Sequence, residues 1–285
     1  MIMCLNGGVG NQMFRYAFAR SVSIAKGEEL FFHDCFGPEY DSQRVYSLDA
    51  FNVKVKWIDV SRLELQQKGL FYAEKNQGEG AFCYTRDVYD TPPGCYFEGC
   101  FQTEKYFNDD KIGPNVWPNS VIGAELSVRA PKSPLTEEVA DKIIASPGST
   151  FIHVRRTDYT LPQSIEIHGN LGMKYYNRAM NYIRERVSDA KFFVFSDDPE
   201  WCRANFPDCQ IVGHNKPGTK AGGPGQEHED IWLMSMCENA IIPNSTFGWW
   251  GAWLGRSKTV IAPKIWLWSN PGSFKDIVPD RWVRL

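Results

Sequence analysis

Residues 240–264 read "AIIPNSTFGWWGAWLGRSKTVIAPK", and this stretch decides the fold. An apolar run at 240–244 precedes a Trp-rich segment at 245–255, and a second apolar run follows at 259–264. We predict a strand, a helix and a strand. The helix is so apolar that we interpret it as part of a core rather than as a sugar-stacking platform. Short connections between such elements are typical of strands that lie parallel in one sheet.

The same alternation extends back toward residue 149. Apolar runs that read as buried strands are followed by segments with the periodicity of amphipathic helices. We expect strands at 149–154, 191–196 and 210–214, and helices at 172–187, 198–206 and 228–239. Strand and helix therefore alternate five times, which predicts a parallel sheet covered by helices on both faces.

The chain also begins with a strand, a turn and a helix. "MIMCL" at 1–5 reads as a strand and "GGVG" at 7–10 as a turn. Apolar residues from Gln12 onward follow helical spacing until Gly27, which suits a helix stop. A second strand is expected at 30–34, so this part starts as a β-α-β unit.

The middle of the chain is harder to interpret. Between residues 36 and 110 the periodicity weakens and aromatic residues are frequent, so we place no elements there. Pro-containing segments at 111–120 and 129–138 indicate a junction between domains. We therefore predict an α/β protein with two domains, 1–125 and 126–285.

Composition limits the class of protein. Of the 285 residues 43% are hydrophobic and 23% charged, the net charge is −3 and the pI is about 6.0, which argues against a nucleic-acid-binding protein. The longest apolar stretch, 247–255, is about half of what a bilayer span requires. The N-terminus lacks the features of a signal peptide, so we expect a cytoplasmic protein. Its eight cysteines lack C-x-x-C or zinc spacing, and we expect mostly buried free thiols.

Polar residues stand at the carboxyl ends of four strands expected in the second half. They are Arg155, Arg156 and Asp158; Asp197 and Asp198; His214; and Asn244, Ser245 and Thr246. In an open α/β sheet, ligands bind in the crevice outside the carboxyl ends of the strands. We therefore interpret these residues as a binding edge rather than as scattered surface polarity.

The residue types at this edge favour a nucleoside diphosphate. Paired arginines match phosphate oxygens bidentately. Ser245 and Thr246 open a helix, whose first backbone N–H groups favour anions. The carboxylates of Asp197 and Asp198 suit guanine, whose N1–H and N2–H₂ both donate. Capping of the next helix is the alternative for Asp198, because Pro199 follows it.

The glycine turn at 7–10 is a second helix entrance of this kind. A dinucleotide fingerprint would need G-x-G-x-x-G, but Gly8 and Gly10 are followed by Met13 where the third glycine belongs. Gly8, Gly10 and Asn11 are therefore candidate residues for binding a nucleotide whose kind the turn alone does not settle, because glycines let a ligand approach the backbone. Capping of the helix is the alternative for Asn11.

Five segments resemble the bacterial α-1,2-fucosyltransferases of glycosyltransferase family 11. They are "GGVGNQMFRYAFA", "HVRRTDY", "FSDDPEW", "EDIWLMSMCENAIIPNSTFGWWGAWL" and "VIAPKIW", and the similarity runs from residue 5 to 265. H-x-R-R-x-D together with S-S/T-F-S/G-W-W-G-A-W-L is a specific combination. The resemblance implies a GT-B-like α/β fold of two facing Rossmann-type domains with parallel sheets. The first would be the acceptor-side domain and the second would bind GDP-fucose.

The resemblance also implies an activity and roles for individual residues. The activity is an inverting, metal-independent transfer of L-fucose from GDP-fucose to O2 of a terminal β-galactoside, without a cofactor. The implied roles are Arg155 on the β-phosphate with Arg156 in support, His153 and Asp198 beside the guanine, Ser245, Thr246 and the amide of Phe247 on the diphosphate, and Asn11 on the donor from the first domain.

The general base is less clearly marked. Asp158, Glu166 and His168 follow the arginine motif, and we name Asp158 as the base. Orientation of Arg155 or Arg156 by an ion pair is the alternative for Asp158. The chain departs from the family pattern at Thr157, where many members carry Gly, and at Gly248, where many carry Ser. Neither departure removes a charge, so both bear on substrate detail.

Two other classes of function fit the sequence less well. A nucleotide-sugar-modifying NAD-dependent oxidoreductase is disfavoured because the dinucleotide fingerprint fails. A non-catalytic carbohydrate-binding protein would fit the ten Trp and twelve Tyr, but such modules are mostly β-rich. The expected partners are GDP-fucose and a galactose-terminated glycan, without nucleic acid or a transmembrane segment. Peripheral contact with the inner face of a membrane, the exact acceptor, the oligomeric state and the role of residues 36–110 are left open.

Overall fold

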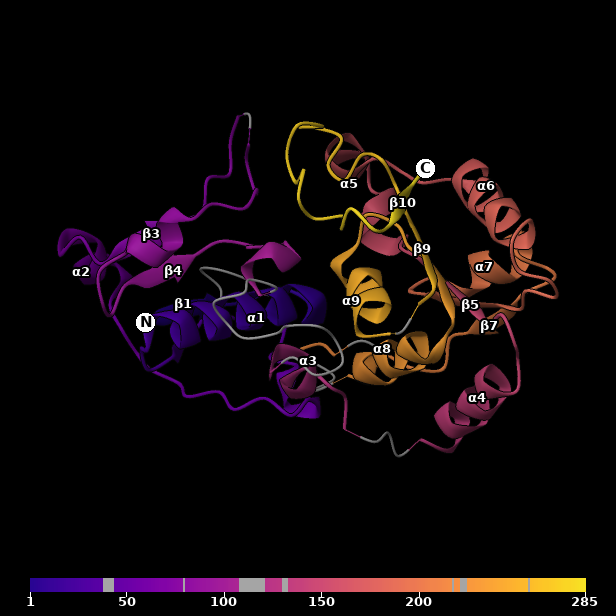
Figure 1. The fold of residues 1–285 in the computed structure, drawn as a ribbon, viewed down its shortest axis with the longest axis horizontal. Helices are drawn as coiled ribbons and strands as arrows, with labels where there is room; N and C mark the ends of the chain where they lie inside the picture. Colours follow the sequence, from indigo (N-terminus) through magenta and orange to yellow (C-terminus); the bar gives the residue numbers. More distant parts are fainter. Residues whose placement is uncertain are drawn as a thin grey trace. The chain divides into compact units, whose positions relative to one another are not determined.

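The computed structural model describes residues 1–37, 44–78, 80–107, 121–129, 133–216, 218–220, 225–255 and 257–285. The chain divides into two compact units (Figure 1). Unit 1 comprises Met1–Arg129, Gly218–Gly225 and Gly272–Pro279, and unit 2 comprises Ala130–Pro217, Gln226–Pro271 and Asp280–Leu285. The main division lies a few residues after the predicted boundary at 125, and no sequence pattern predicted the two later segments of unit 1. The proline-containing segment expected at 111–120 lies outside the described residues, as does part of the one at 129–138.

Unit 1 is built on a four-stranded parallel sheet in the order β2-β1-β4-β3. Its strands are β1 (Ile2–Leu5), β2 (Phe31–Asp34), β3 (Phe71–Ala73) and β4 (Tyr96–Glu98). Helix α1 (Val9–Lys26) connects β1 to β2, so the predicted β-α-β unit is confirmed. The helix starts three residues earlier than expected and therefore includes part of the glycine turn. It ends at Gly27, whose left-handed conformation (φ +64°) suits glycine.

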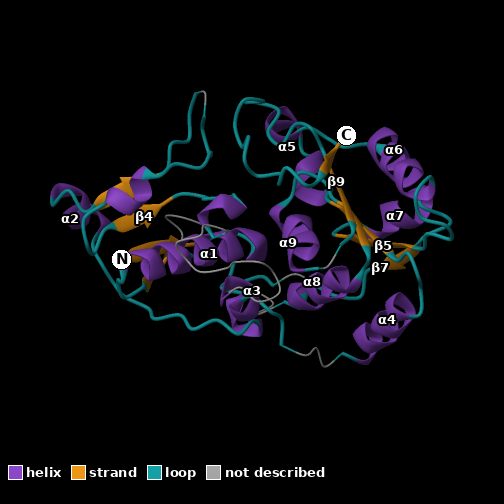
Figure 2. Ribbon diagram, in the orientation of Figure 1, coloured by secondary structure: helices purple, strands orange, loops and turns teal. Residues whose placement is uncertain are grey.

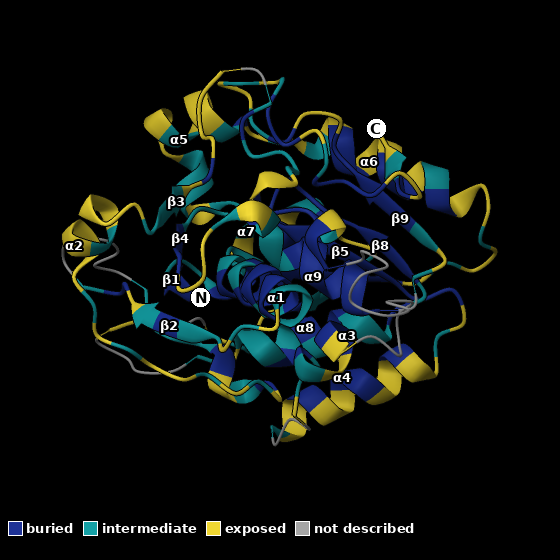
Figure 3. Ribbon diagram, turned by 60° about the vertical axis from the view of Figure 1, so that its left-hand side comes forward, coloured by how far each residue is buried: buried dark blue, intermediate teal, exposed yellow. Residues whose placement is uncertain are grey.

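The core of unit 1 is aromatic and centres on α1, which is largely buried (Figure 3). Phe14 and Phe18 are fully buried, and Phe18 stacks on Phe101 with ring centroids 3.7 Å apart. The remaining elements are short: α2 (Arg62–Gln67), α3 (Val121–Glu125) and 3₁₀ turns at Leu48–Ala50, Asp87–Asp90 and Glu104–Tyr106. Elements of three to six residues carry too few repeats for a periodicity to appear. This explains why residues 36–110 were not predictable.

Unit 2 contains a six-stranded parallel sheet in the order β10-β9-β8-β5-β6-β7 (Figure 2). Its strands are β5 (Thr150–Val154), β6 (Phe192–Ser196), β7 (Gln210–Val212), β8 (Asn239–Ile241), β9 (Thr259–Ala262) and β10 (Val283–Arg284). The strands predicted from 149 onward are thereby confirmed. The connecting helices are α4 (Pro134–Ile144), α5 (Pro162–His168), α6 (Met173–Arg184), α7 (Pro199–Asn205), α8 (Glu227–Met236) and α9 (Thr246–Leu254). Of these, α4 and α5 were not predicted.

Helices cover both faces of this sheet, as expected for a parallel sheet (Figure 1). On one face Ile152 and Val194 pack in one core with residues of α6 and α7. On the other face His153 lies against Gly248 of α9, and Gly251 of α9 lies against Met234 of α8. Side chains at alternate positions of β5 therefore point to opposite helix layers.

The Trp-rich helix is a core element, as predicted. Trp249 and Trp250 are fully buried in α9, and Trp253 is buried as well. All eight cysteines are free, and Cys4, Cys35, Cys95, Cys202 and Cys237 are buried. No helix in the described part of the chain has both the length and the apolarity that a membrane crossing needs.

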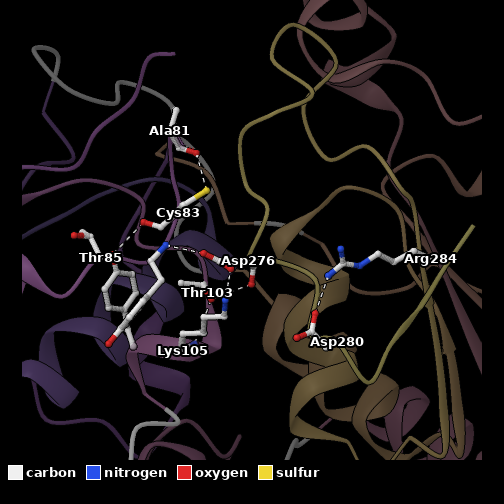
Figure 4. Close-up of polar contacts among 10 residues, drawn as sticks. Ala81, Cys83, Thr85, Thr103, Lys105, Asp276, Asp280 and Arg284 are labelled. Atoms are coloured by element: carbon white, nitrogen blue, oxygen red, sulfur yellow. Dashed lines mark hydrogen bonds and ion pairs between the residues drawn. The ribbon is translucent and has the colours of Figure 1, made fainter. Parts of the chain in front are cut away.

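A C-terminal segment, Gly272–Pro279, belongs to unit 1 and is held there by polar contacts of Asp276 (Figure 4) and by an aromatic contact. The Asp276 carboxylate accepts the Tyr84 backbone N–H at 3.0 Å and pairs with Lys105. Phe274 stacks on Phe82 at a centroid distance of 4.5 Å. These partners are separated by more than 170 residues in the sequence, so only the folded chain brings them together.

Candidate functional site

Arg155 stands at the carboxyl end of β5, where it is held between two carboxylates. One terminal nitrogen, Nη2, lies 2.7 Å from Oδ1 of Asp158, and the other, Nη1, lies 2.8 Å from Oδ2 of Asp197. Burial alone would lower the pKa of the guanidinium, but the two carboxylates raise it above its ordinary value. The side chain is therefore a fixed and permanently charged fork.

Asp197, directly after β6, organises the loop that carries the arginines. Besides pairing with Arg155, it accepts the Arg156 backbone N–H at 2.9 Å and the Thr157 hydroxyl at 2.5 Å. Both oxygens of the carboxylate are thus occupied. Asp197 was assigned to donor binding from the sequence; in the structure its contacts are to the loop, and a contact with a donor remains a prediction.

Arg156 is held by the turn between β6 and α7. Its Nε lies 3.1 Å from Oδ2 of Asp198, and its guanidinium carbon lies 4.0 Å from the centre of the Trp201 ring. Asp198 also caps α7 by accepting the Trp201 backbone N–H at 3.1 Å. The capping alternative for Asp198 is therefore confirmed, while its role beside guanine remains a prediction.

His153 lies beneath the N-terminus of α9 and is only 4% exposed. Burial, with a smaller contribution from Arg155, lowers its pKa to about 3, so the imidazole is neutral at physiological pH. Its ring centre is 5.2 Å from that of Phe247. A Cβ atom at Gly248 would lie 2.6 Å from its Nδ1, so glycine at this departure from the family pattern makes room for the histidine.

The mouth of α9 adjoins the arginine loop. Ser245 is the N-cap residue and, within the described residues, its hydroxyl caps no N–H of the helix. The dipole of a helix favours anions at its N-terminus, so Thr246 and Phe247 mark an anion-favouring position. The Tyr159 hydroxyl joins this mouth to the arginine loop by donating to the Asn244 carbonyl oxygen at 3.3 Å.

Asn244 has a different environment from the one expected. Its side-chain amide is buried and donates to the backbone oxygens of His168 at 2.7 Å and Trp266 at 2.9 Å. The amide thus ties two loops together. Sequence reasoning placed Asn244 at the right edge of the sheet but could not identify these partners, because both are backbone atoms remote in the chain.

The other base candidates have distinct surroundings. Glu166 is exposed on α5. His168 stacks on Tyr159 with ring centres 4.5 Å apart, and burial lowers its pKa. Asp158 is half-exposed and forms an ion pair with Arg155. This geometry agrees with the alternative role of Asp158, in which it orients the arginine.

The predicted site residues Gly8, Gly10 and Asn11 belong to unit 1. Gly8 is the N-cap residue of α1, and Asn11 lies in the first turn, so the capping alternative for Asn11 is wrong. Instead, Oδ1 of Asn11 accepts from the Gln102 amide at 3.0 Å. The turn itself depends on Gly7, whose φ of +82° favours glycine.

Two residues that sequence reasoning did not single out hold this edge of unit 1. Gln12 is fully buried and donates to the backbone oxygens of Gly7 and Val45, at 2.7 and 2.9 Å. Arg15 donates to the backbone oxygens of Asn6 and Gly99, at 2.6 and 2.8 Å. The motif signal "GGVGNQ" was present, but it could not separate residues that hold the turn from residues that meet a ligand.

His214, after β7, belongs to a polar network within unit 2. Its Nε2 lies 2.8 Å from the Thr136 hydroxyl, which also contacts Glu229. The network joins α4 to α8. Among the residues that the structure describes, no three His, Cys, Asp or Glu side chains form a group that could hold a metal ion. Metal independence itself remains a prediction.

Comparison with protein families and curated proteins gives concordant results. Residues 135–285 match the family model of glycosyl transferase family 11. An α-1,2-colitosyltransferase of Escherichia coli is 30% identical over 99% of this chain and 97% of its own length. The O-antigen biosynthesis glycosyltransferase WbnK of Escherichia coli is 29% identical over the full length of both chains. A galactoside α-(1,2)-fucosyltransferase of Bos taurus is 32% identical over 39% of this chain and 31% of its own.

Solved structures with a similar fold are also fucosyltransferases. The α-1,6-fucosyltransferase NodZ, co-crystallised with GDP, covers 89% of this chain and 92% of its own with a TM-score of 0.51. Arabidopsis thaliana FUT1 in complex with GDP covers 92% of this chain and 69% of its own with a TM-score of 0.50. Identities of 14% and 11% limit this likeness to the fold. The expected GT-B-like α/β class with parallel sheets is confirmed.

Proposed function

This chain belongs to glycosyl transferase family 11, and we propose that it transfers L-fucose from GDP-β-L-fucose to O2 of a terminal β-galactoside. The product would be an α-1,2-fucoside. Of the three relatives described above, two are named for an α-1,2 linkage and one of these two for fucosyl transfer.

The observation that carries the proposal is the position of Arg155. As the bond between fucose and the diphosphate breaks, negative charge grows on the β-phosphate. A guanidinium already fixed by Asp158 and Asp197 stabilises that charge without reorganisation. The mouth of α9 adds backbone N–H groups suited to the same anion. Each carboxylate contacts a single terminal nitrogen of Arg155, so one of the two nitrogens can turn to a phosphate oxygen while the other keeps its carboxylate partner.

The proposed reaction inverts the configuration at the fucose C1 atom. The galactoside O2 attacks C1 from the face opposite the leaving group, and the electron pair of the C1–O bond stays on the β-phosphate of GDP. The hydroxyl proton passes to Asp158, the half-exposed carboxylate that follows the arginine motif. The general base contributes only modestly to the rate of this reaction, since the transition state is oxocarbenium-like and GDP is a good leaving group.

Colitose is the second candidate for the transferred sugar. The E. coli relative that is 30% identical over nearly the whole chain is named a colitosyltransferase. Colitose is L-fucose without its 3-hydroxyl group, so the two donors share the GDP moiety and differ in one hydrogen-bonding group. A site with a partner for that hydroxyl would favour fucose strongly, because the partner would otherwise stay unpaired.

Mass spectrometry tests the proposal directly. The protein is incubated with lactose, EDTA and either GDP-fucose, GDP-colitose or GDP-mannose. We expect a product heavier by one deoxyhexose with GDP-fucose and none with GDP-mannose. Product from GDP-colitose alone would replace the donor in the proposal. Product that forms only without EDTA would overturn metal independence, and no stabilisation by GDP in a thermal shift assay would overturn the transferase assignment.

A further inference from the structure

Four exposed apolar side chains in unit 2 have no place in the function described so far. They are Leu161, Ile165 and Ile167 from the region of α5, and Trp268 from the turn after β9. Trp268 is the largest of them and is 50% exposed. A half-exposed indole presents a large ring face that a ligand can cover, so this side chain is a candidate contact residue.

Trp268 is held in place by its surroundings. The backbone N–H groups of Trp268 and Ser269 both donate to the Ile167 carbonyl oxygen, at 2.8 and 3.1 Å. The edge of the indole packs against Gly169, where a Cβ atom would lie 2.4 Å from the Trp268 Nε1. Gly169 also has a φ of +71°, so two requirements select glycine there. A ring fixed in this way loses little conformational entropy when a ligand covers it.

The same loops connect Trp268 to the candidate site. The buried amide of Asn244, next to the N-cap of α9, donates to the backbone oxygens of His168 and Trp266. His168 stacks on Tyr159, and the Arg155 guanidinium carbon lies 5.6 Å from the Tyr159 ring centre. A continuous set of contacts therefore leads from the proposed phosphate-binding arginine to the turn that carries Trp268.

The connection to the candidate site favours a sugar among the ligands that an exposed tryptophan suits. A surface that binds anionic lipids needs Lys or Arg beside its apolar residues. Residues 157–173 and 265–274 contain neither, but the exposed Lys174, Lys264 and Lys275 border these segments, so anionic vesicles belong among the probes of the test. A neutral sugar needs no such charge: a pyranose ring presents an apolar face of C–H groups to an aromatic ring and keeps its hydroxyls at the edge.

We propose that Trp268 is the stacking platform for the galactose ring of the acceptor. The proposal rests on the proposed function, in which the acceptor must lie beside the fucose C1 atom and hence beside the diphosphate.

Steady-state kinetics separate this role from a structural one. With GDP-fucose and lactose, we expect Trp268→Ala to raise the KM for lactose at least about tenfold and Trp268→Phe about threefold, because the smaller ring keeps part of the contact. The KM for GDP-fucose stays within about twofold in both variants. Ile144→Ala is the matched control, since Ile144 is 70% exposed on α4 of the same unit and should change neither constant. Equal thermal stability of the variants excludes misfolding.

A binding measurement keeps the test independent of turnover. Saturation-transfer NMR with methyl β-galactoside and GDP should show contact with the wild type and a loss of at least fivefold in Trp268→Ala. An unchanged KM for lactose together with an unchanged NMR signal would overturn the proposal, even if fucose is transferred. Binding to vesicles of phosphatidylglycerol that Trp268→Ala abolishes, with lactose kinetics unchanged, would assign Trp268 to a membrane contact instead. A wild type that binds the galactoside but transfers no fucose would overturn the proposed function alone.

Discussion

In each unit the side chain of one arginine lies near the carboxyl ends of the parallel strands. The two arginines differ in their partners, which are backbone oxygens in unit 1 and carboxylates in unit 2. Arg15 in unit 1 donates to the backbone oxygens of Asn6 and Gly99. Arg155 in unit 2 pairs with the side chains of Asp158 and Asp197. Withdrawing Arg15 from its partners would leave two carbonyl groups without a donor, whereas a phosphate can share Arg155 with its carboxylates. The same residue type thus serves the fold in one unit and is suited to a ligand in the other.

The largest effect is expected for Arg155→Ala. Loss of a preorganised donor aimed at developing charge costs about 10²–10³ in kcat, and Arg155→Lys should recover little because the fork is lost. Fucosyl transfer followed by mass spectrometry gives kcat, and chemical unfolding monitors the fold. Near wild-type turnover of Arg155→Ala would contradict the role of Arg155 in catalysis. A loss of activity that parallels a loss of stability would assign Arg155 to the fold, like Arg15.

Arg15→Ala should act on stability. Hydrogen bonds from a charged group to two partly buried carbonyl oxygens are removed, and we expect the free energy of unfolding to fall by about 2–3 kcal/mol. Urea denaturation measures this change, and Arg15→Lys, which retains one charged donor, should lose less. A larger fall in kcat than for Arg155→Ala, at unchanged stability, would reverse the roles assigned to the two arginines.

The smallest effect concerns the buried neutral histidine next to Arg155. Burial lowers the pKa of His153 to about 3, so between that value and its unfolded value the unfolded chain binds more protons. The contribution of His153 to the free energy of unfolding is therefore fully present above about pH 6.5. It falls as the pH is lowered, by about 2 kcal/mol at pH 5. The pH dependence of urea unfolding should be shallower for His153→Asn than for the wild type. Parallel curves for the two proteins would show that the imidazole is accessible to protons.

The strand–helix alternation of unit 2 was predictable because it is local. A twelve-residue helix such as α6 carries enough repeats for its period to be recognised, and Asp198 followed by Pro199 marks the start of α7. The Arg155–Asp158 pair was also predictable, since the residues are three positions apart. The shorter elements of unit 1 carried no such signal, and α4 was hidden in a proline-containing segment interpreted as a junction.

The sequence by itself therefore determined the α/β class, the parallel sheet of unit 2, the buried Trp-rich helix and the edge at which the charged residues gather. Only the tertiary structure decided which of these residues hold one another: Asp197 with the arginine loop, Asn244 with two remote backbone oxygens, and Asp276 with unit 1. The reason is physical. Periodicity indicates which face of one element is buried. A hydrogen bond between segments depends instead on how separate elements pack, and a local sequence pattern does not determine that packing.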